Sequence, residues 1–378
     1  MDNLKLAIEA LDLLFFRDAK PFNAANSTFA ETLELPYTST IYGALRSKVL
    51  SENYDKYDDF IKAKADKITD VIGSPEKKGD LRIDFFSIMN KNKEIFLPIA
   101  SDLVVEKDNS KNIFELELFE KPEWLSYDSN YKFDYILTTS GNCKIEKPER
   151  KYISLNNLEK YLNCEEHNIE ENELDFFIKE FRTGIKINQL KNQAEEGKLY
   201  RKELIRMKDE YRYFIELSND KKLLPEKGVL KLGGESKGAF YYPCNVDNTI
   251  RLNEKTKDNI RRSKMFKMYL ATPAIFNKGW IPNFVDDDLI VSLDNNINFK
   301  IICSSIGKYK MVSGWDMSKG KPKAAYRVLP AGSVFYCKIL DDKFNLKLLL
   351  DKFHGKSISD KRVKDGFGIT YIGGIKNV

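Results

Sequence analysis

The sequence is poor in the residue on which most acid–base catalysis depends. Among its 378 residues there are only two histidines, His167 and His354. A histidine-based ribonuclease or a catalytic triad would have to rest on one of them. A lone histidine meets none of the geometric requirements of a catalytic site, so we expect surface or capping roles for both. This scarcity argues against histidine catalysis and leaves Lys or Tyr chemistry open.

Paired cysteines and long apolar runs are also missing. The five cysteines form no Cys-x-x-Cys pair, which argues against a zinc site or a thioredoxin-like motif. No apolar run approaches the roughly 20 residues that a membrane span needs. Residues 1–10 lack the apolar core of a signal peptide. We therefore expect reduced, mostly buried thiols and a cytoplasmic protein.

Nucleotide-binding motifs are incomplete. His354-Gly355-Lys356-Ser357 ends like a Walker loop, but Leu350 stands where the first glycine is required. Gly366-x-Gly368 lacks the third glycine of the dinucleotide fingerprint, because Tyr371 stands in its place. A polymerase-like Gly-Gly-Asp-Asp is absent, and Asp286-Asp287-Asp288 is best explained as a solvated loop. We predict no cofactor and no metal.

What the sequence does contain is a strong charge asymmetry. The net charge is +5, but residues 1–180 hold 24 Lys and Arg against 35 Asp and Glu, a net of −11, and residues 181–378 hold 38 against 22, a net of +16. Lys and Arg dominate affinity for nucleic-acid backbones. The basic half therefore suggests a polyanion partner. The alternative is that the charges only solvate two different surfaces.

The pattern of short strands with few helices predicts an α+β fold with antiparallel sheets. We expect two ferredoxin-like (RRM-like) βαββαβ domains with insertions. The first would cover residues 1–180, with an insertion at about 53–80 and β-hairpin extensions. The second would cover residues 181–378 and carry glycine-rich loops. The clearest elements are a first strand over 4–16, a helix over 41–50 capped by residues 38–40, a run over 200–217, and helices over 254–266 and 341–353.

The stretch over residues 231–240, Lys-Leu-Gly-Gly-Glu-Ser-Lys-Gly-Ala-Phe, predicts a strand, a glycine turn and a second strand. Glycine adopts positive φ and lets a backbone approach a ligand closely, and with lysines beside it the natural ligand is a phosphate. A plain tight hairpin explains the glycines equally well. The narrower prediction is that they serve close packing between domains, with Lys237 contacting RNA.

Residues 181–188 form a strand-like segment with basic residues at alternate positions. Alternate side chains of a strand share one face, so Arg182, Lys186 and Asn188 would display a row of donors. The same residues could instead mark a solvated strand edge that guards against aggregation. Basic residues beside aromatic ones, as at Tyr326-Arg327, favour RNA binding, in which bases stack on aromatic rings.

Several short motifs in a fixed order resemble the RAMP superfamily of CRISPR-associated proteins, and within it the third subunits of the type III-B Cmr effector complex. They span almost the whole chain. In order they are Phe16-Arg17-Asp18 with Pro21-Phe22, Thr40-Ile41-Tyr42-Gly43-Ala44-Leu45-Arg46, Arg182-Thr183-Gly184-Ile185-Lys186-Ile187 with Glu196-Gly197-Lys198-Leu199-Tyr200, Leu232-Gly233-Gly234-Glu235, Lys323-Ala324 to Gly332-Ser333, and Gly366-Phe367-Gly368.

The resemblance implies two ferredoxin-like domains and a non-catalytic role in antiviral defence. Such a subunit caps the foot of the complex and holds the repeat-derived 5′ tag of the crRNA. Its neighbours are the large polymerase-like subunit and the first backbone subunit. The insertion at about 53–80 matches no motif, so its role is open.

The candidate RNA-binding residues combine the resemblance with the physical argument that Arg and Lys hold phosphates while aromatic rings lie under bases. Arg46 is expected at the start of the first helix. An alternative function is a metal-independent RAMP endoribonuclease that processes the crRNA precursor, and a third is a protein-only scaffold. The full set is Arg17, Phe22, Arg46, Arg182, Lys186, Asn188, Gly233, Gly234, Lys237, Lys323, Tyr326, Arg327, Gly366 and Gly368.

Overall fold

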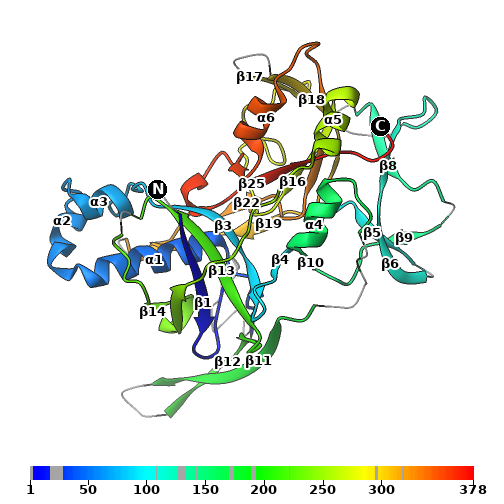
Figure 1. The fold of residues 1–378 in the computed structure, drawn as a ribbon. Coiled ribbons are helices and arrows are strands. Elements are labelled where there is room, and N and C mark those ends of the chain that lie inside the picture. Colours follow the sequence, from blue (N-terminus) through cyan, green and yellow to red (C-terminus); the bar gives the residue numbers. More distant parts are fainter. Residues whose placement is uncertain are drawn as a thin grey trace. The chain divides into compact units, whose positions relative to one another are not determined.

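The fold is known from a computed structural model (Figure 1). It describes every residue except 1–2, 18–28, 108, 127–132, 142, 168, 170–173, 189–192, 221, 294–296 and 317–318, and it describes only the backbone of 109–112, 186 and 196–198. The chain forms two compact units: unit 1 is Met1–Lys93, Asp175–Val246 and Met311–Tyr326, and unit 2 is Glu94–Leu174, Asp247–Lys310 and Arg327–Val378. Both units draw on the chain before and after residue 180, and the predicted domain boundary there stays a prediction.

Unit 1 is built on an antiparallel sheet. Its strands are β1 (Leu4–Ala10), β3 (Arg82–Asn90), β13 (Tyr211–Ser218), β14 (Gly228–Lys231) and β15 (Gly238–Pro243). Their order in the sheet is β3-β13-β1-β15-β14. The central strands are rich in buried aliphatic and aromatic side chains, as expected for strands paired on both edges. β14, η2 (Gly234–Ser236) and β15 confirm the predicted strand, glycine turn and strand.

The predicted first strand over 4–16 is wrong beyond Ala10. Leu11 is 59% exposed, and its N–H donates to the carbonyl of Gly238 as the chain leaves the sheet. Leu13 and Phe15 then pack with Ala30 and Leu204 in a separate buried cluster. The apolar run therefore continues past the strand because it serves a second core.

Helix α1 (Thr38–Glu52) buries Ile41, Leu45 and Val49, which recur at the spacing of one helix face. The predicted cap at residues 38–40 is wrong: Tyr37 is the N-cap residue, and its side chain makes no capping bond. The predicted insertion is helical, with η1 (Tyr54–Lys56), α2 (Tyr57–Ile61) and α3 (Lys67–Ile72). Asp66 starts α3 with a capping box.

A long two-stranded ribbon belongs to unit 1. β11 (Phe177–Asn188) and β12 (Gln193–Met207) run antiparallel side by side (Figure 1), and β2 (Phe29–Ala30) adds to β12 in parallel. The predicted single run over 200–217 is thus two strands, because Lys208 to Glu210 turn the chain from β12 into β13. Two short strands, β20 (Trp315–Asp316) and β21 (Lys321–Pro322), also pair in this unit.

Unit 2 contains a six-stranded antiparallel sheet in the order β17-β18-β23-β16-β25-β24. Helix α6 (Leu346–Phe353) packs on it, with the ring of Phe353 5.6 Å from that of Phe299. The sheet strands are β16 (Met265–Leu270), β17 (Ile290–Leu293), β18 (Ile297–Ser305), β23 (Val334–Ile339), β24 (Lys356–Ser357) and β25 (Ile369–Gly373). The other elements of this unit are β4 (Ile95–Pro98), β5 (Leu103–Glu106), β6 (Asn109–Glu115), β7 (Glu117–Glu120), β8 (Tyr135–Thr138), β9 (Ile145–Glu146), β10 (Tyr152–Ser154), α4 (Leu155–Leu162), α5 (Glu254–Ser263) and η3 (Val363–Asp365).

The predicted α+β class is confirmed, with many strands and few helices. The chain passes between the two units five times, and two of these passages fall within β19 (Lys310–Val312) and β22 (Tyr326–Val328). Among the described residues, no helix has both the length and the apolar character that crossing a membrane requires.

Candidate nucleic-acid interface

The glycine turn after β14 is held by close packing on the segment that follows β1. Gly233 has φ +80°, and a Cβ atom built there would lie 2.6 Å from the carbonyl oxygen of Phe15. The N–H of Gly234 donates to that same oxygen at 2.8 Å. This amide is therefore already used inside the protein. The glycines serve packing between segments from the two halves of the sequence, both within unit 1.

Arg206 lies 3.5 Å from Asp12, which follows β1, and the charges of Lys237 and Arg182 act on the same carboxylate. The backbone N–H of Leu13 holds the pKa of Asp12 below its ordinary value, and the positive charges of Arg206, Lys237 and Arg182 lower it further. Arg182 is on β11, Arg206 on β12, and Lys237 follows the glycine turn. The structure therefore brings Arg182 and Lys237, both predicted from the sequence, to one surface.

The ribbon reaches the glycine turn through a second contact. Arg182 is paired in register with Lys202, so their side chains share a face, and Lys202 forms an ion pair with Glu235 in the turn. Arg206 donates to Glu180 at 2.6 Å, and this bond raises the pKa of Arg206. Among the described residues, Arg182 and Lys237 make no ion pair, so their charges remain available to phosphates. We call Arg182, Lys202, Arg206 and Lys237 the basic cluster.

The predicted row from Arg182 to Asn188 is interrupted. The pairing register shifts between Ile185 and Ile187, so the strict alternation of side chains does not continue to Asn188. Asn188 pairs with Gln193 at the end of β11. The side chain of Lys186 lies outside the described part of the chain.

Arg46 is not at the start of a helix, as the sequence predicts, but well inside α1. Its guanidinium donates to the carbonyl of Ser74 at 2.8 Å and lies over the rings of Tyr42 and Phe60, at 5.9 and 5.8 Å from their centroids. Ser74 and Phe60 belong to the insertion. Arg46 thus ties the insertion to α1.

The remaining candidates occupy several places. Arg17 is exposed, and its backbone forms an isolated antiparallel β-bridge with Thr32. Phe22 lies outside the described residues. Lys323 is exposed, and its N–H donates to Gly314 at 2.8 Å, next to Trp315, which is 55% exposed. Tyr326 and Arg327 are neighbours on β22, but they fall in different units. In unit 2, the guanidinium of Arg327 lies 5.0 Å from the ring centroid of Tyr309.

The second glycine-rich turn is part of the interior of unit 2. Gly366 has φ +81°, and its carbonyl accepts a hydrogen bond from Thr272 at 2.7 Å. Gly368 has φ +75°, and a Cβ atom there would lie 2.6 Å from the backbone nitrogen of Ser359. Both glycines are buried, so their visible role is to let two backbone segments approach closely.

Sequence reasoning missed Lys202 and Arg206. They lie four residues apart on β12, opposite the residues around Arg182. The polar triplet Lys208-Asp209-Glu210 was the available signal, because a turn there separates β12 from β13. A hairpin over 177–207 would have placed both residues beside Arg182.

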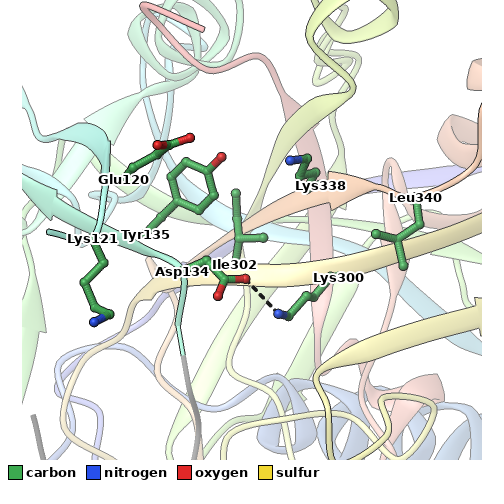
Figure 2. A pocket seen from close by; sticks show the side chains of 8 residues that line it. All are labelled: Glu120, Lys121, Asp134, Tyr135, Lys300, Ile302, Lys338 and Leu340. Atoms are coloured by element: carbon green, nitrogen blue, oxygen red, sulfur yellow. Dashed lines mark hydrogen bonds and ion pairs between the residues drawn. The ribbon is translucent and has the colours of Figure 1, made fainter. Parts of the chain in front are cut away.

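A shallow pocket of about 440 Å³ opens in unit 2, whereas the basic cluster belongs to unit 1. Figure 2 shows Lys300 pointing to Asp134, with which it forms an ion pair at 2.7 Å. Burial raises the pKa of Tyr135, and the neighbouring Glu120 raises it further. Ile302 contributes apolar surface. The lining carries three lysines against two acidic residues, and Lys300 and Asp134 neutralise each other, so the pocket offers little net charge to a ligand.

Unit 2 also buries a network of ionisable groups. Asp102 accepts hydrogen bonds from Tyr161 at 2.6 Å and Tyr336 at 2.5 Å. Lys267 is fully buried and pairs with Glu115 at 2.6 Å. Burial raises the pKa of Glu115 and raises those of both tyrosines well above the ordinary value. Groups this deeply enclosed cannot touch an RNA chain, so the network belongs to the interior of the unit.

The two histidines are both partly enclosed. His354 is the C-cap residue of α6; its Nδ1 accepts from the N–H of Ile372 at 3.2 Å, and its Nε2 lies 2.8 Å from the carbonyl of Ile250. Burial lowers the pKa of His354 and of His167. In the part of the chain that the structure describes, no three His, Cys, Asp or Glu side chains gather as a metal site would require.

Comparison with known proteins gives one match to a protein family. The family model described as CRISPR-associated protein (Cas_Cmr3) matches residues 6–375. A comparison with curated proteins finds no match.

Similar chains occur in several solved structures. A chain in the cryo-EM structure of the Type III-B Cmr-beta bound to cognate target RNA is 17% identical, with a TM-score of 0.48, over 88% of this chain and 86% of that one. A chain in the same kind of structure with AMPPnP is also 17% identical, with a TM-score of 0.48, over 92% and 91%. A chain in the crystal structure of the Csm1-Csm4 cassette with AMPPNP is 10% identical, with a TM-score of 0.34, over 98% of each.

Proposed function

This chain belongs to the Cas_Cmr3 family of CRISPR-associated proteins, and from that membership we propose that it is a non-catalytic, RNA-binding subunit of a type III-B (Cmr) RNA-guided effector complex. It holds the repeat-derived 5′ tag of the crRNA. It also bridges the large polymerase-like subunit to the backbone subunits, in antiviral defence in the cytoplasm. Two ferredoxin-like domains, divided at about residue 180, remain our prediction for the underlying organisation.

The observation that carries the proposal is the basic cluster. Arg182 and Lys237 come from segments 55 positions apart in the sequence, and their charges act on the same carboxylate, Asp12. Neither is consumed by an ion pair with a described residue. Two unpaired cations at fixed positions on strands and a rigid turn can hold neighbouring phosphates of a single strand.

The proposal predicts that the isolated chain binds a tag RNA and leaves it intact. Arg182→Ala and Lys237→Ala should each weaken binding and reduce the slope of log affinity against log salt by about 0.7, the value expected for one phosphate contact on a single strand. Lys231→Ala is the matched control. Lys231 is an exposed lysine on the same hairpin, outside the basic cluster, and its removal should change neither quantity.

Two results would contradict the proposal. Specific cleavage of repeat RNA without added metal would support the endoribonuclease alternative. RNA affinity equal in the wild-type protein, Arg182→Ala and Lys237→Ala would support a protein-only scaffold, or RNA binding at another surface.

A further inference from the structure

The ribbon of β11 and β12 has a second face that is apolar. Residues paired in register share a face, and successive residues alternate between faces. Arg182 and Lys202 are on one face; the other carries Phe181, Ile185 and Leu199, which are 49%, 45% and 55% exposed. Phe29 on β2, 39% exposed, lies 6.2 Å from the ring of Phe181. We call Phe29, Phe181, Ile185 and Leu199 the apolar face.

The charges on this side of the ribbon nearly cancel. Lys179 lies between two carboxylates, at 3.4 Å from Glu203 and 3.9 Å from Glu34. Arg201 makes no ion pair among the described residues, and its guanidinium lies 4.1 Å from the centroid of the Phe181 ring. One unpaired cation therefore stands within an apolar surface.

We propose that the apolar face docks a neighbouring protein subunit, whose apolar side chains cover it and whose carboxylate reaches Arg201. The inference rests on the proposed function, because it takes the chain to be part of a multi-subunit complex. Contiguous apolar surface rimmed by polar residues is typical of protein interfaces.

RNA is a poorer occupant of this face. Neighbouring phosphates of a strand need at least two uncompensated cations, and the described residues of this side offer one, Arg201. Bases stack on aromatic or guanidinium planes, whereas Ile185 and Leu199 are aliphatic and have no such plane. The two faces of the ribbon therefore have different partners: the face with Arg182 contacts RNA, and the apolar face contacts protein.

The test measures binding of the full chain to the separately purified large subunit and backbone subunit of its complex, after RNase treatment. The double variant Ile185→Ser with Leu199→Ser should bind its partner roughly 10- to 100-fold more weakly, since each truncated anchor costs about one factor of three to ten. Arg201→Glu should weaken binding about 10-fold. Val229→Ser is the matched control, because Val229 is 51% exposed on β14, outside the apolar face.

Tag-RNA affinity is measured on the same proteins. Partner binding then tests this inference, and RNA affinity separately tests the proposed function. The double variant should keep its RNA affinity within twofold, while Arg182→Ala loses RNA affinity and keeps its protein partner. All substituted positions of the apolar face are exposed, so thermal unfolding should shift little. Arg201→Glu gives an independent reading if the double variant unfolds.

Four outcomes would overturn the inference. The wild-type chain could bind neither subunit without RNA, or the double variant and Arg201→Glu could both bind as tightly as the wild type. Loss of RNA affinity in the double variant would identify RNA as the occupant. A wild-type dimer that the double variant dissociates would identify a second copy of this chain.

Discussion

Gly233→Ala should destabilise the protein because Gly233 occupies a backbone conformation that other residues avoid. Its φ of 80° and ψ of −159° lie in a region that is essentially restricted to glycine. Placing an L-residue there costs about 1–3 kcal/mol. The new Cβ would also lie 2.6 Å from the carbonyl oxygen of Phe15, a backbone atom that cannot move independently. Relieving this overlap adds about 1 kcal/mol.

The expected total is a loss of about 2–4 kcal/mol in the free energy of unfolding, which corresponds to a drop of roughly 3–5 °C in Tm for cooperative unfolding of all 378 residues. Gly234→Ala is the matched control. Gly234 lies next to Gly233 without a positive φ, and its nearest contact would be the Phe15 ring at 3.0 Å, a side chain that can shift. The control should lose less than about 1 kcal/mol. Differential scanning calorimetry on both variants measures the difference.

Measuring RNA binding distinguishes two roles of Gly233: packing against the neighbouring segment, or shaping a loop whose backbone holds a phosphate. If Gly233 serves packing, then Gly233→Ala binds tag RNA normally at a temperature at which it is folded. The reasoning fails if Gly233→Ala has the same Tm as the wild type, or if Gly234→Ala loses as much stability as Gly233→Ala. A folded Gly233→Ala protein that has lost RNA affinity would instead show that the loop backbone holds the RNA.

Three further predictions concern stability. Gly43→Ala should stabilise the protein by about 0.5–1 kcal/mol, as measured by thermal unfolding, because Gly43 lies within α1 and a Cβ there meets nothing within 4 Å. Lys267→Met should cost about 3–5 kcal/mol at neutral pH in urea unfolding, because it removes the nearer of the two lysines that pair with the buried Glu115 and leaves Lys376 at 3.9 Å. Burial raises the pKa of Glu115, so the loss should shrink as the pH falls towards 4.5 and this carboxyl is protonated; an equal loss at all pH values would contradict this. Asp247 should titrate with a pKa of about 2 in an NMR experiment, because its bonds to Thr249 and Arg251 favour the carboxylate, and Thr249→Ala should move the pKa towards 3.8. The stability from Asp247 is present above pH 3.8 and is lost as the pH falls towards 2.

Local patterns predicted the parts of the fold that depend on neighbouring residues. The glycine turn was found because Gly233 and Gly234 stand between two strand-like runs. The predicted helix over 341–353 is confirmed only in part, since α6 begins at Leu346. The end of β1 was missed because the apolar run continues to Phe16. Only the packing of Leu13 and Phe15 on Leu204 shows why it does.

The site was predictable in part for the same reason. Arg182 and Lys237 were found from their local surroundings, one in a basic strand and one beside glycines. That they lie near the same carboxylate depends on pairing across the ribbon, and strand register is set by tertiary contacts that no local segment encodes. The surroundings of Arg46 were not predicted at all. Its partners Ser74 and Phe60 come from the insertion, whose sequence matched no motif.

The most direct test of the account is to map the RNA that contacts this chain within its assembled complex. Ultraviolet crosslinking, followed by sequencing of the RNA and mass spectrometry of the peptides, identifies both sides of the contact. The account predicts crosslinks between the repeat-derived 5′ tag and peptides within residues 177–207 and 228–243, weakened by Arg182→Ala and Lys237→Ala. Crosslinks confined to other parts of the crRNA, or to peptides outside these segments, would contradict it.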